Sequence, residues 1–247
     1  MGGGLAVRLD RFLTGQNIAT RKEAKELAKA GLITLNGAVV KDSSVNIDPA
    51  ADSVAVRGIP VHYREHLYIM LNKPGGVVCA TEDKRHRTVL DLLPEPLQRR
   101  GLFPAGRLDI DTEGFVLITD DGDFAHKMLS PKCHVPKTYQ AVLEHGISGE
   151  ETERFCSGLI LSDGTRCLPA QLSVLREGDA PLVETVLYEG KFHQVKRMFE
   201  AVGNRVVSLK RIKIGMLPLD PKLRPGEARE IMHKECLQIL GSNSGKK

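Results

Sequence analysis

The residues best suited to chemistry lie in the stretch GRLDIDTEGFVLITDDG, which runs from Gly106 to Gly122. Aspartates and a glutamate flank a run of aliphatic residues in it. Carboxylates at this density suit three kinds of site: a calcium loop, a pair of catalytic carboxylates, or one carboxylate that acts as a nucleophile.

A calcium loop fits only part of this pattern. Counted from Asp109, oxygen-bearing side chains occupy loop positions 1, 3, 5 and 12, with Gly114 at position 6, as in an EF-hand. Position 12, however, is Asp120 where a bidentate glutamate is expected, and FVLIT after Gly114 predicts a strand. We therefore do not expect calcium.

Two other uses of the carboxylates remain open. In an extended segment Asp109 and Asp111 point to the same side, about 6.5 to 7 Å apart, which suits a glycosidase. Sugar sites usually contain aromatic side chains, and this chain has no Trp and 4% aromatics. Alternatively, Arg107 shares the face of Asp109, so that a cation holds a phosphate beside one carboxylate nucleophile. An Asp-rich turn without function, ending at Gly114, is the plainest interpretation of the spacing alone.

Composition limits the class of protein. The chain has 247 residues, of which 41% are hydrophobic and 27% charged, enough for one substantial core and a small extra domain. No apolar run approaches the roughly 18 residues of a membrane span, and MGGGLAVRLD does not resemble a signal peptide, so we expect a cytoplasmic protein with no membrane contact. The five cysteines are scattered, and neither they nor the group His126, Cys133 and His134 have the spacing of a zinc site. We expect no metal.

The elements before residue 67 predict a small basic domain. Residues 8–16 have the apolar spacing of a short helix, and residues 20–31 begin with a capping box and end in glycine. Asn36-Gly37 is the strongest two-residue hairpin signal. The outer face of the second helix carries four cations, which alone would usually be a solvated face: Arg21, Lys22, Lys25 and Lys29.

From about residue 67 the pattern changes to strands and loops. LYIMLNKPGGVVCA predicts two strands joined by a tight turn, and TVLDLLPEPL has a helical pattern. VVSLKRIKIG predicts either an edge strand protected by Lys210 and Lys213 or a rim that contacts phosphates. The fold class is therefore α+β: a small helical and hairpin domain (residues 1–66), a core on a mixed, mostly antiparallel sheet flanked by helices (67–240), and a tail (241–247).

The first domain resembles the S4 RNA-binding domain over roughly residues 7–57. The resemblance rests on two short helices, a lysine-rich second helix and an Asn-Gly hairpin. In that family the second helix and the following turn contact RNA phosphates. The resemblance therefore implies that the four cations of the second helix bind RNA, through contacts that position the protein without reading sequence.

The second domain resembles the pseudouridine synthases, specifically the branch that contains the small-subunit rRNA enzyme. GRLDIDTEG matches the family's G-R-L-D-x-D-T-x-G signature, although Glu113 and Phe115 depart from the usual residues. Three further motifs follow the family's order: MLNKPGGVVCAT, SPKCHVPKTYQAVL and EGKFHQVKRMFEAVGNRVV. The resemblance covers residues 7 to 240.

The resemblance implies a role for each matching residue. Asp109 is the nucleophile, Arg107 helps to displace the flipped base, Tyr139 stacks on the uracil, and Lys196 pairs with Asp109. Taken alone, Tyr139 would more often be a core aromatic and Lys196 a solvated helix lysine. Two further basic residues of the motifs are expected to contact RNA: Lys73 and Arg197.

The sequence thus predicts a monomeric enzyme that isomerises one uridine of small-subunit rRNA, expected to be uridine 516 of 16S rRNA. Its partner is that rRNA or a partly assembled small subunit, and the isomerisation involves no redox change, so no cofactor is expected. Three alternatives stay open: a synthase for large-subunit (23S) rRNA, a non-catalytic S4-type assembly factor that binds rRNA, and, more remotely, a glycosidase.

Overall fold

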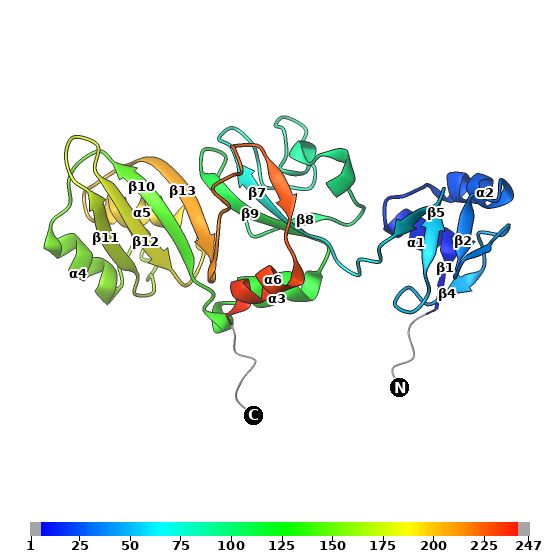
Figure 1. The fold of residues 1–247 in the computed structure, drawn as a ribbon. Coiled ribbons are helices and arrows are strands. Elements are labelled where there is room, and N and C mark those ends of the chain that lie inside the picture. Colours follow the sequence, from blue (N-terminus) through cyan, green and yellow to red (C-terminus); the bar gives the residue numbers. More distant parts are fainter. Residues whose placement is uncertain (1–5, 242–247) are drawn as a thin grey trace, which may run out of the picture. The chain divides into compact units, whose positions relative to one another are not determined.

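The computed structural model describes residues 6–241, which divide into two compact units (Figure 1). One unit runs to His66 and includes the short segment Gln98–Gly101, and the other contains Leu67–Leu97 and the chain from Leu102 onward. Arg99 holds that segment in the first unit, because its guanidinium donates to the carbonyl oxygens of Arg64 and Glu65 (3.0 and 3.1 Å). Of the expected tail, residues 242–247 lie outside the described residues.

The first unit has the two helices and the hairpin that the sequence predicts. Thr20 and Glu23 form the capping box, with the Thr20 hydroxyl accepting from the Glu23 N–H (3.3 Å) and the Glu23 carboxylate from the Thr20 N–H (2.7 Å). Asn36 and Gly37 both have positive φ, 52° and 83°, as this hairpin turn requires. The elements are β1 Val7–Arg8, α1 Leu9–Gly15, α2 Arg21–Lys29, β2 Ile33–Leu35, β3 Ala38–Val39, β4 Asn46–Ile47, β5 Val54–Val56 and β6 Ile59–Val61.

A nine-stranded sheet forms the centre of the second unit. Seven strands follow the order β11-β12-β10-β13-β9-β7-β15, while β8 pairs with β9 and β14 with β13. Every pair is antiparallel except β9 with β13. The strands are β7 Tyr68–Lys73, β8 Phe103–Ala105, β9 Glu113–Thr119, β10 Lys137–Leu143, β11 Gln171–Arg176, β12 Leu182–Leu187, β13 Val206–Ile214, β14 Leu217–Pro218 and β15 Ala228–Glu230.

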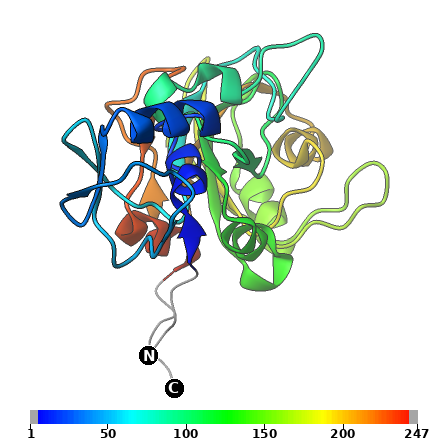
Figure 2. The same ribbon diagram turned by 90° about the vertical axis from the view of Figure 1, so that its right-hand side faces the viewer.

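Helices cover both faces of this sheet, because successive side chains of a strand point to opposite faces. On β9, Val116 belongs to the core that contains Phe155 of α4 and Phe199 of α5, whereas Phe115 belongs to the core that contains Phe124 of α3 and Ile239 of α6. In Figure 2, α5 (gold) and α6 (red) accordingly lie on opposite sides of the sheet. The expected α+β class is confirmed. The helices are α3 Gly122–Leu129, α4 Gly149–Ser157, α5 Gln194–Ala201 and α6 His233–Leu240.

None of the described helices is long and apolar enough to cross a membrane.

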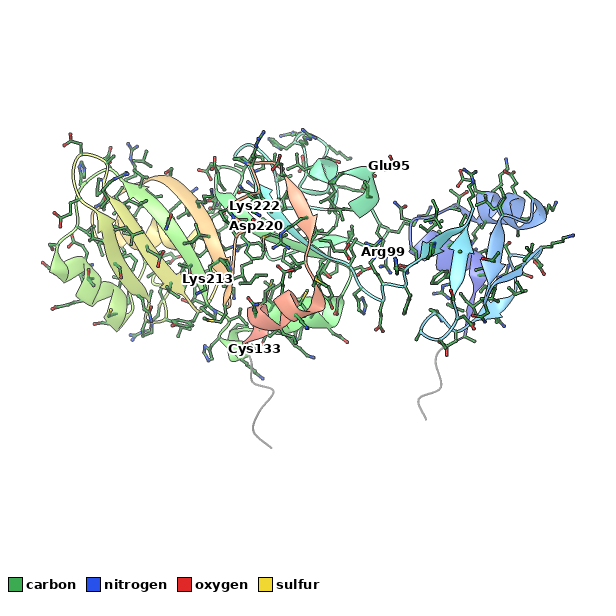
Figure 3. The ribbon with its side chains drawn as sticks, viewed as in Figure 1. Glu95, Arg99, Cys133, Lys213, Asp220 and Lys222 are labelled. Atoms are coloured by element: carbon green, nitrogen blue, oxygen red, sulfur yellow. The ribbon has the colours of Figure 1, made fainter. Side chains whose placement is uncertain are left out.

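Two local predictions are wrong, and one of two alternatives for a third segment is excluded. The segment after the turn at residues 74–76 is not a strand, since only one isolated bridge joins Val78 to Thr88. Residues 90–97 form two 3₁₀ turns in place of a helix, because prolines at 94 and 96 interrupt it. β13 is an interior strand that pairs with both β10 and β9, although its lysines suggested an edge; Lys213 lies near its end (Figure 3).

Candidate active site

Asp109 lies in the loop that joins β8 to β9. The chain turns in this loop, although the sequence predicted an extended segment. The buried ammonium of Lys73 stabilises this loop through hydrogen bonds to its backbone. It donates to the carbonyl oxygens of Ile110 (3.1 Å), Thr112 (2.8 Å) and Pro74 (3.0 Å). The position of the aspartate is thus set by hydrogen bonds to the backbone on its C-terminal side.

The expected contact of Lys73 with RNA is wrong. Its side chain is 0% exposed, and burial lowers the pKa of the ammonium, while nearby acidic side chains oppose that shift. A cation that binds phosphate must reach the surface. Lys73 instead satisfies the carbonyl groups of a tight loop, a role that motif spacing does not distinguish from RNA binding.

Two carboxylates and two basic side chains meet above the loop. Lys196 of α5 hydrogen-bonds both oxygens of Asp111 (2.6 and 2.8 Å) and lies 3.5 Å from Oδ2 of Asp109. His193 Nε2 lies 3.4 Å from Oδ1 of Asp109. The hydrogen bond from Lys196 lowers the pKa of Asp111. Lys196 therefore bridges the two carboxylates: it forms the ion pair with Asp109 that the sequence predicted, and its hydrogen bonds go to Asp111.

Asp109 lines a cavity of about 390 Å³ that also contains Tyr139, within the range of pockets that hold small ligands. The side chain of Asp109 is 26% exposed, whereas that of Asp111 is 66% exposed and does not line the cavity. Of the two carboxylates, Asp109 is thus the one positioned to meet a ligand in the cavity. The apolar part of the lining comes from Leu108, Leu129, Leu187, Val195 and Leu209.

A β-bulge places two side chains on the cavity. Between β10 and β13 the register changes so that Thr138 pairs with Lys213 and Tyr139 with Arg211, leaving Ile212 unpaired. Bulges redirect side chains in this way and are common beside active sites. Nη1 of Arg211 lies 3.5 Å from the Tyr139 hydroxyl, and both residues line the cavity.

Arg211 is fixed on its other side by β9. Its Nε donates to the carbonyl oxygen of Phe115 (2.8 Å), and the side chain is 4% exposed. The backbones approach very closely here, since a Cβ added to Gly114 would lie 2.2 Å from the carbonyl oxygen of Arg211. Sequence reasoning missed Arg211; the only signal was a third cation on β13, beside Lys210 and Lys213.

Lys137, at the start of β10, is a second cation of the cavity that the sequence did not indicate. It is 8% exposed and donates to the carbonyl oxygen of Met128 (3.3 Å). Burial, followed by the charge of Arg211, lowers the pKa of Lys137 to about 8.

An exposed aromatic pair borders the same cavity. The rings of Phe192 and His193 stack with centroids 3.8 Å apart and planes 17° apart, and Phe192 is 69% exposed. His193 has φ +47°, an uncommon conformation for a residue other than glycine. Sequence reasoning missed both residues, because neither exposure nor a left-handed backbone is visible in the motif.

The remaining expected RNA contacts fall in three environments. Arg107 is exposed and lines the cavity. Arg197 is tied to Asp163 by an ion pair of 2.5 Å and is only partly exposed. The four cations of α2 (Arg21, Lys22, Lys25 and Lys29) are all exposed, in the first unit.

Within residues 6–241 no group of three or more His, Cys, Asp or Glu side chains is arranged to hold a metal ion.

A carboxylate with basic neighbours at an aromatic-containing cavity, in a chain that also carries a small unit with a basic helix, fits the class of RNA-modifying enzymes. The family models give the assignment. That of RNA pseudouridylate synthase matches residues 67–201, and that of the S4 domain matches residues 7–52. The chain therefore belongs to the RNA pseudouridylate synthase family and is an isomerase with an S4 domain.

Relatives resemble it over nearly their whole length. An uncharacterized RNA pseudouridine synthase of Bacillus subtilis is 46% identical over 93% of this chain and 96% of its own. The ribosomal small subunit pseudouridine synthase A of Escherichia coli is 40% identical over 95% of this chain and 100% of its own. A crystal structure of a pseudouridylate synthase covers 94% of this chain and 99% of its own, with 36% identity and a TM-score of 0.65.

Proposed function

We propose that this enzyme converts one uridine of small-subunit rRNA into pseudouridine, with Asp109 as the nucleophile. The observation that carries the proposal is the position of Asp109, which meets Tyr139 in one cavity while Lys196 and His193 lie beside its carboxylate. The small-subunit substrate is supported by relatives such as the Escherichia coli enzyme, which is named for that subunit. Uridine 516 of 16S rRNA is the proposed target.

The reaction breaks the N1–C1′ bond of the uridine and forms a C5–C1′ bond. The proton of C5 leaves, and N1 gains a proton. The base must first leave its stack, which costs a few kcal/mol and is offset by contacts in the enclosing cavity. Asp109 attacks C6 of the base or C1′ of the ribose, Tyr139 stacks on the uracil, and exposed Arg107 occupies the vacated space or holds the phosphate.

The partner is the rRNA, free or in a partly assembled small subunit, and the enzyme acts as a cytoplasmic monomer without a cofactor. The exposed cations of α2 add contacts to phosphates. Arg197 contributes less to RNA binding than a free arginine, because Asp163 already pairs with it.

The test is tritium release from small-subunit rRNA labelled at C5 of uridine, followed by mapping of the product. Wild-type protein is expected to release tritium from one site, and Asp109→Asn to lose the activity by on the order of 10³-fold or more. Asp111→Asn is the matched control, because Asp111 lies outside the cavity; we expect a loss below about 10-fold.

Other outcomes would redirect the proposal. If Asp111→Asn loses the activity and Asp109→Asn retains it, Asp111 would be the nucleophile in place of Asp109. Release only from 23S rRNA would assign the large subunit. Binding without release from either rRNA, free or in assembly particles, would indicate a non-catalytic assembly factor.

A further inference from the structure

Two residues that line the cavity beside Asp109 each have a buried side-chain atom without a hydrogen-bond partner. The two atoms are Nη2 of Arg211 and Oγ1 of Thr112, whose residues are 4% and 2% exposed. Only one other side-chain atom within residues 6–241, Oδ1 of Asn72, shares this state, and Asn72 does not line the cavity. Because buried polar groups are nearly always hydrogen-bonded, two unpaired atoms on residues that line one cavity point to a polar ligand there.

The same cavity has an excess of buried positive charge. Arg211 donates to the Phe115 carbonyl oxygen and the Tyr139 hydroxyl, and Lys137 donates to the Met128 carbonyl oxygen, so all their acceptors are neutral. Among the described residues, no carboxylate forms an ion pair with either cation. Buried charges are normally paired. The cavity therefore favours a ligand that carries or develops negative charge.

We propose that Arg211 and Thr112, aided by the charge of Lys137, bind the carbonyl edge of the target uracil and stabilise the negative charge that the base acquires during isomerisation. This proposal rests on the proposed function, because it places the flipped uridine in the cavity beside Asp109. These residues would act as the donors of an oxyanion hole do in other enzymes, by donating hydrogen bonds to an oxygen that becomes negatively charged.

The charge arises whichever atom Asp109 attacks. Addition of the carboxylate to C6 moves the electrons of the C5–C6 double bond toward O4 and gives an enolate. Cleavage of the N1–C1′ bond leaves its electron pair on N1, from which it is delocalised onto O2 and O4. In both routes the negative charge falls on the carbonyl oxygens of the base, and donors fixed beforehand at the cavity stabilise it.

The lining favours a base over a phosphate group. Tyr139 offers an aromatic ring, and Leu187, Val195 and Leu209 offer apolar surface, which suits a flat ring with polar edges. A phosphate would have to lose its hydration against this apolar surface, which is costly.

Thr112→Val is the first test, because it removes the orphan hydroxyl and keeps the shape of the side chain. Removing an unsatisfied buried hydroxyl should leave the melting temperature unchanged or raise it. The single-turnover rate of tritium release should fall roughly 10- to 100-fold, as for one lost hydrogen bond to a developing charge. Thr119→Val is the control: this buried threonine on β9 accepts a hydrogen bond from the Asp121 N–H (3.0 Å), so its loss should lower stability and spare the rate.

A second test asks which atom of the base is bound. Arg211→Lys keeps the positive charge but removes Nη2, and should lower the rate by roughly 10²- to 10³-fold. It is compared on RNA fragments that carry uridine, 2-thiouridine or 4-thiouridine at the mapped target, since sulfur is the weaker acceptor. If Arg211 binds a carbonyl oxygen, the thio substitution at that oxygen and Arg211→Lys disrupt the same contact. Their effects on the rate should then be non-additive: together they should slow the reaction less than the product of their separate effects.

The outcomes separate this proposal from the proposed function. If wild-type release depends on Asp109 but Thr112→Val and folded Arg211→Lys release tritium at undiminished rates, the role of Arg211 and Thr112 is overturned and the proposed function stands. Full additivity at both carbonyl positions would also overturn that role. No release by wild-type protein would refute the proposed function first.

Discussion

Lys137 is a residue whose burial has a measurable consequence for folding. Its pKa is lowered from 10.5 to about 8, with burial as the main cause and the charge of Arg211 as the next. At pH 7 the ammonium is therefore still charged inside the protein, where it has no acidic partner among residues 6–241. Such a charge lowers the free energy of unfolding.

Replacing Lys137 with an uncharged residue is expected to raise the free energy of unfolding by an amount that depends on pH. Lys137→Met should raise the free energy of unfolding at pH 7 by about 1 to 3 kcal/mol. Because the folded pKa lies below the unfolded one, the unfolded wild type binds more protons between about pH 8 and 10.5, and wild-type stability rises across that window. The difference in free energy of unfolding between the variant and the wild type should therefore shrink as the pH rises through this window. Urea unfolding at several pH values measures it.

The control is Lys22→Met on exposed α2, which should change stability by less than about 0.5 kcal/mol at every pH. A gain for Lys137→Met that stays constant from pH 7 to 10 would show that the buried ammonium is not the cause. Together with a slower reaction, the expected gain would mark Lys137 as a residue kept for function at the expense of stability.

At the scale of elements, the parallel contact of β9 with β13 requires glycine at position 114. The residue has φ +99°, and a Cβ would lie 2.2 Å from the Arg211 carbonyl oxygen. Gly114→Ala should therefore lower the free energy of unfolding by about 3 kcal/mol or more and displace Arg211. Gly122→Ala is the control in urea unfolding: nothing lies within 4 Å of its Cβ position, and it starts α3 without positive φ. An equal effect of both changes would contradict the close-contact argument.

The basic face of α2 gives a second prediction at this scale. Lys22→Ala with Lys25→Ala should weaken rRNA binding and reduce the slope of log K against log salt by about 1 to 2, if each lysine neutralises one phosphate. Fluorescence anisotropy over a salt series measures the slope. Thr20→Ala breaks the capping box and keeps every cation, so it controls for unfolding of the helix. An unchanged slope in the double variant would remove α2 from the RNA contacts.

At the scale of the whole molecule, the sequence predicted correctly those features that depend on interactions between residues close together in the chain. The capping box of α2, the hairpin at Asn36 and the strand after Gly114 depend on neighbours in the chain, and all three are confirmed. The order of the motifs gave the family, and the structure brings Asp109 and Tyr139 to one cavity.

What depends on distant contacts was not predictable. Lys73 is buried under a loop almost forty positions later in the chain, so its type alone suggested a surface cation. The hydrogen bonds of Lys196 reach Asp111, 85 positions earlier in the chain, whereas the sequence indicated only the ion pair with Asp109. Arg211 pairs with Tyr139 next to a bulge, and no periodic pattern reveals which strand receives one.

The pairing of β15 with β7 has a consequence for the order in which the protein is made. The first unit has all its strand partners between Val7 and Val61, whereas β7, which carries Lys73, receives its outer neighbour from Ala228–Glu230. Synthesis proceeds from the N-terminus, and domains generally fold as units. The S4 domain is thus free to fold while the ribosome is still adding the last strand of the catalytic sheet, and the protein gains its RNA-binding module before its active site.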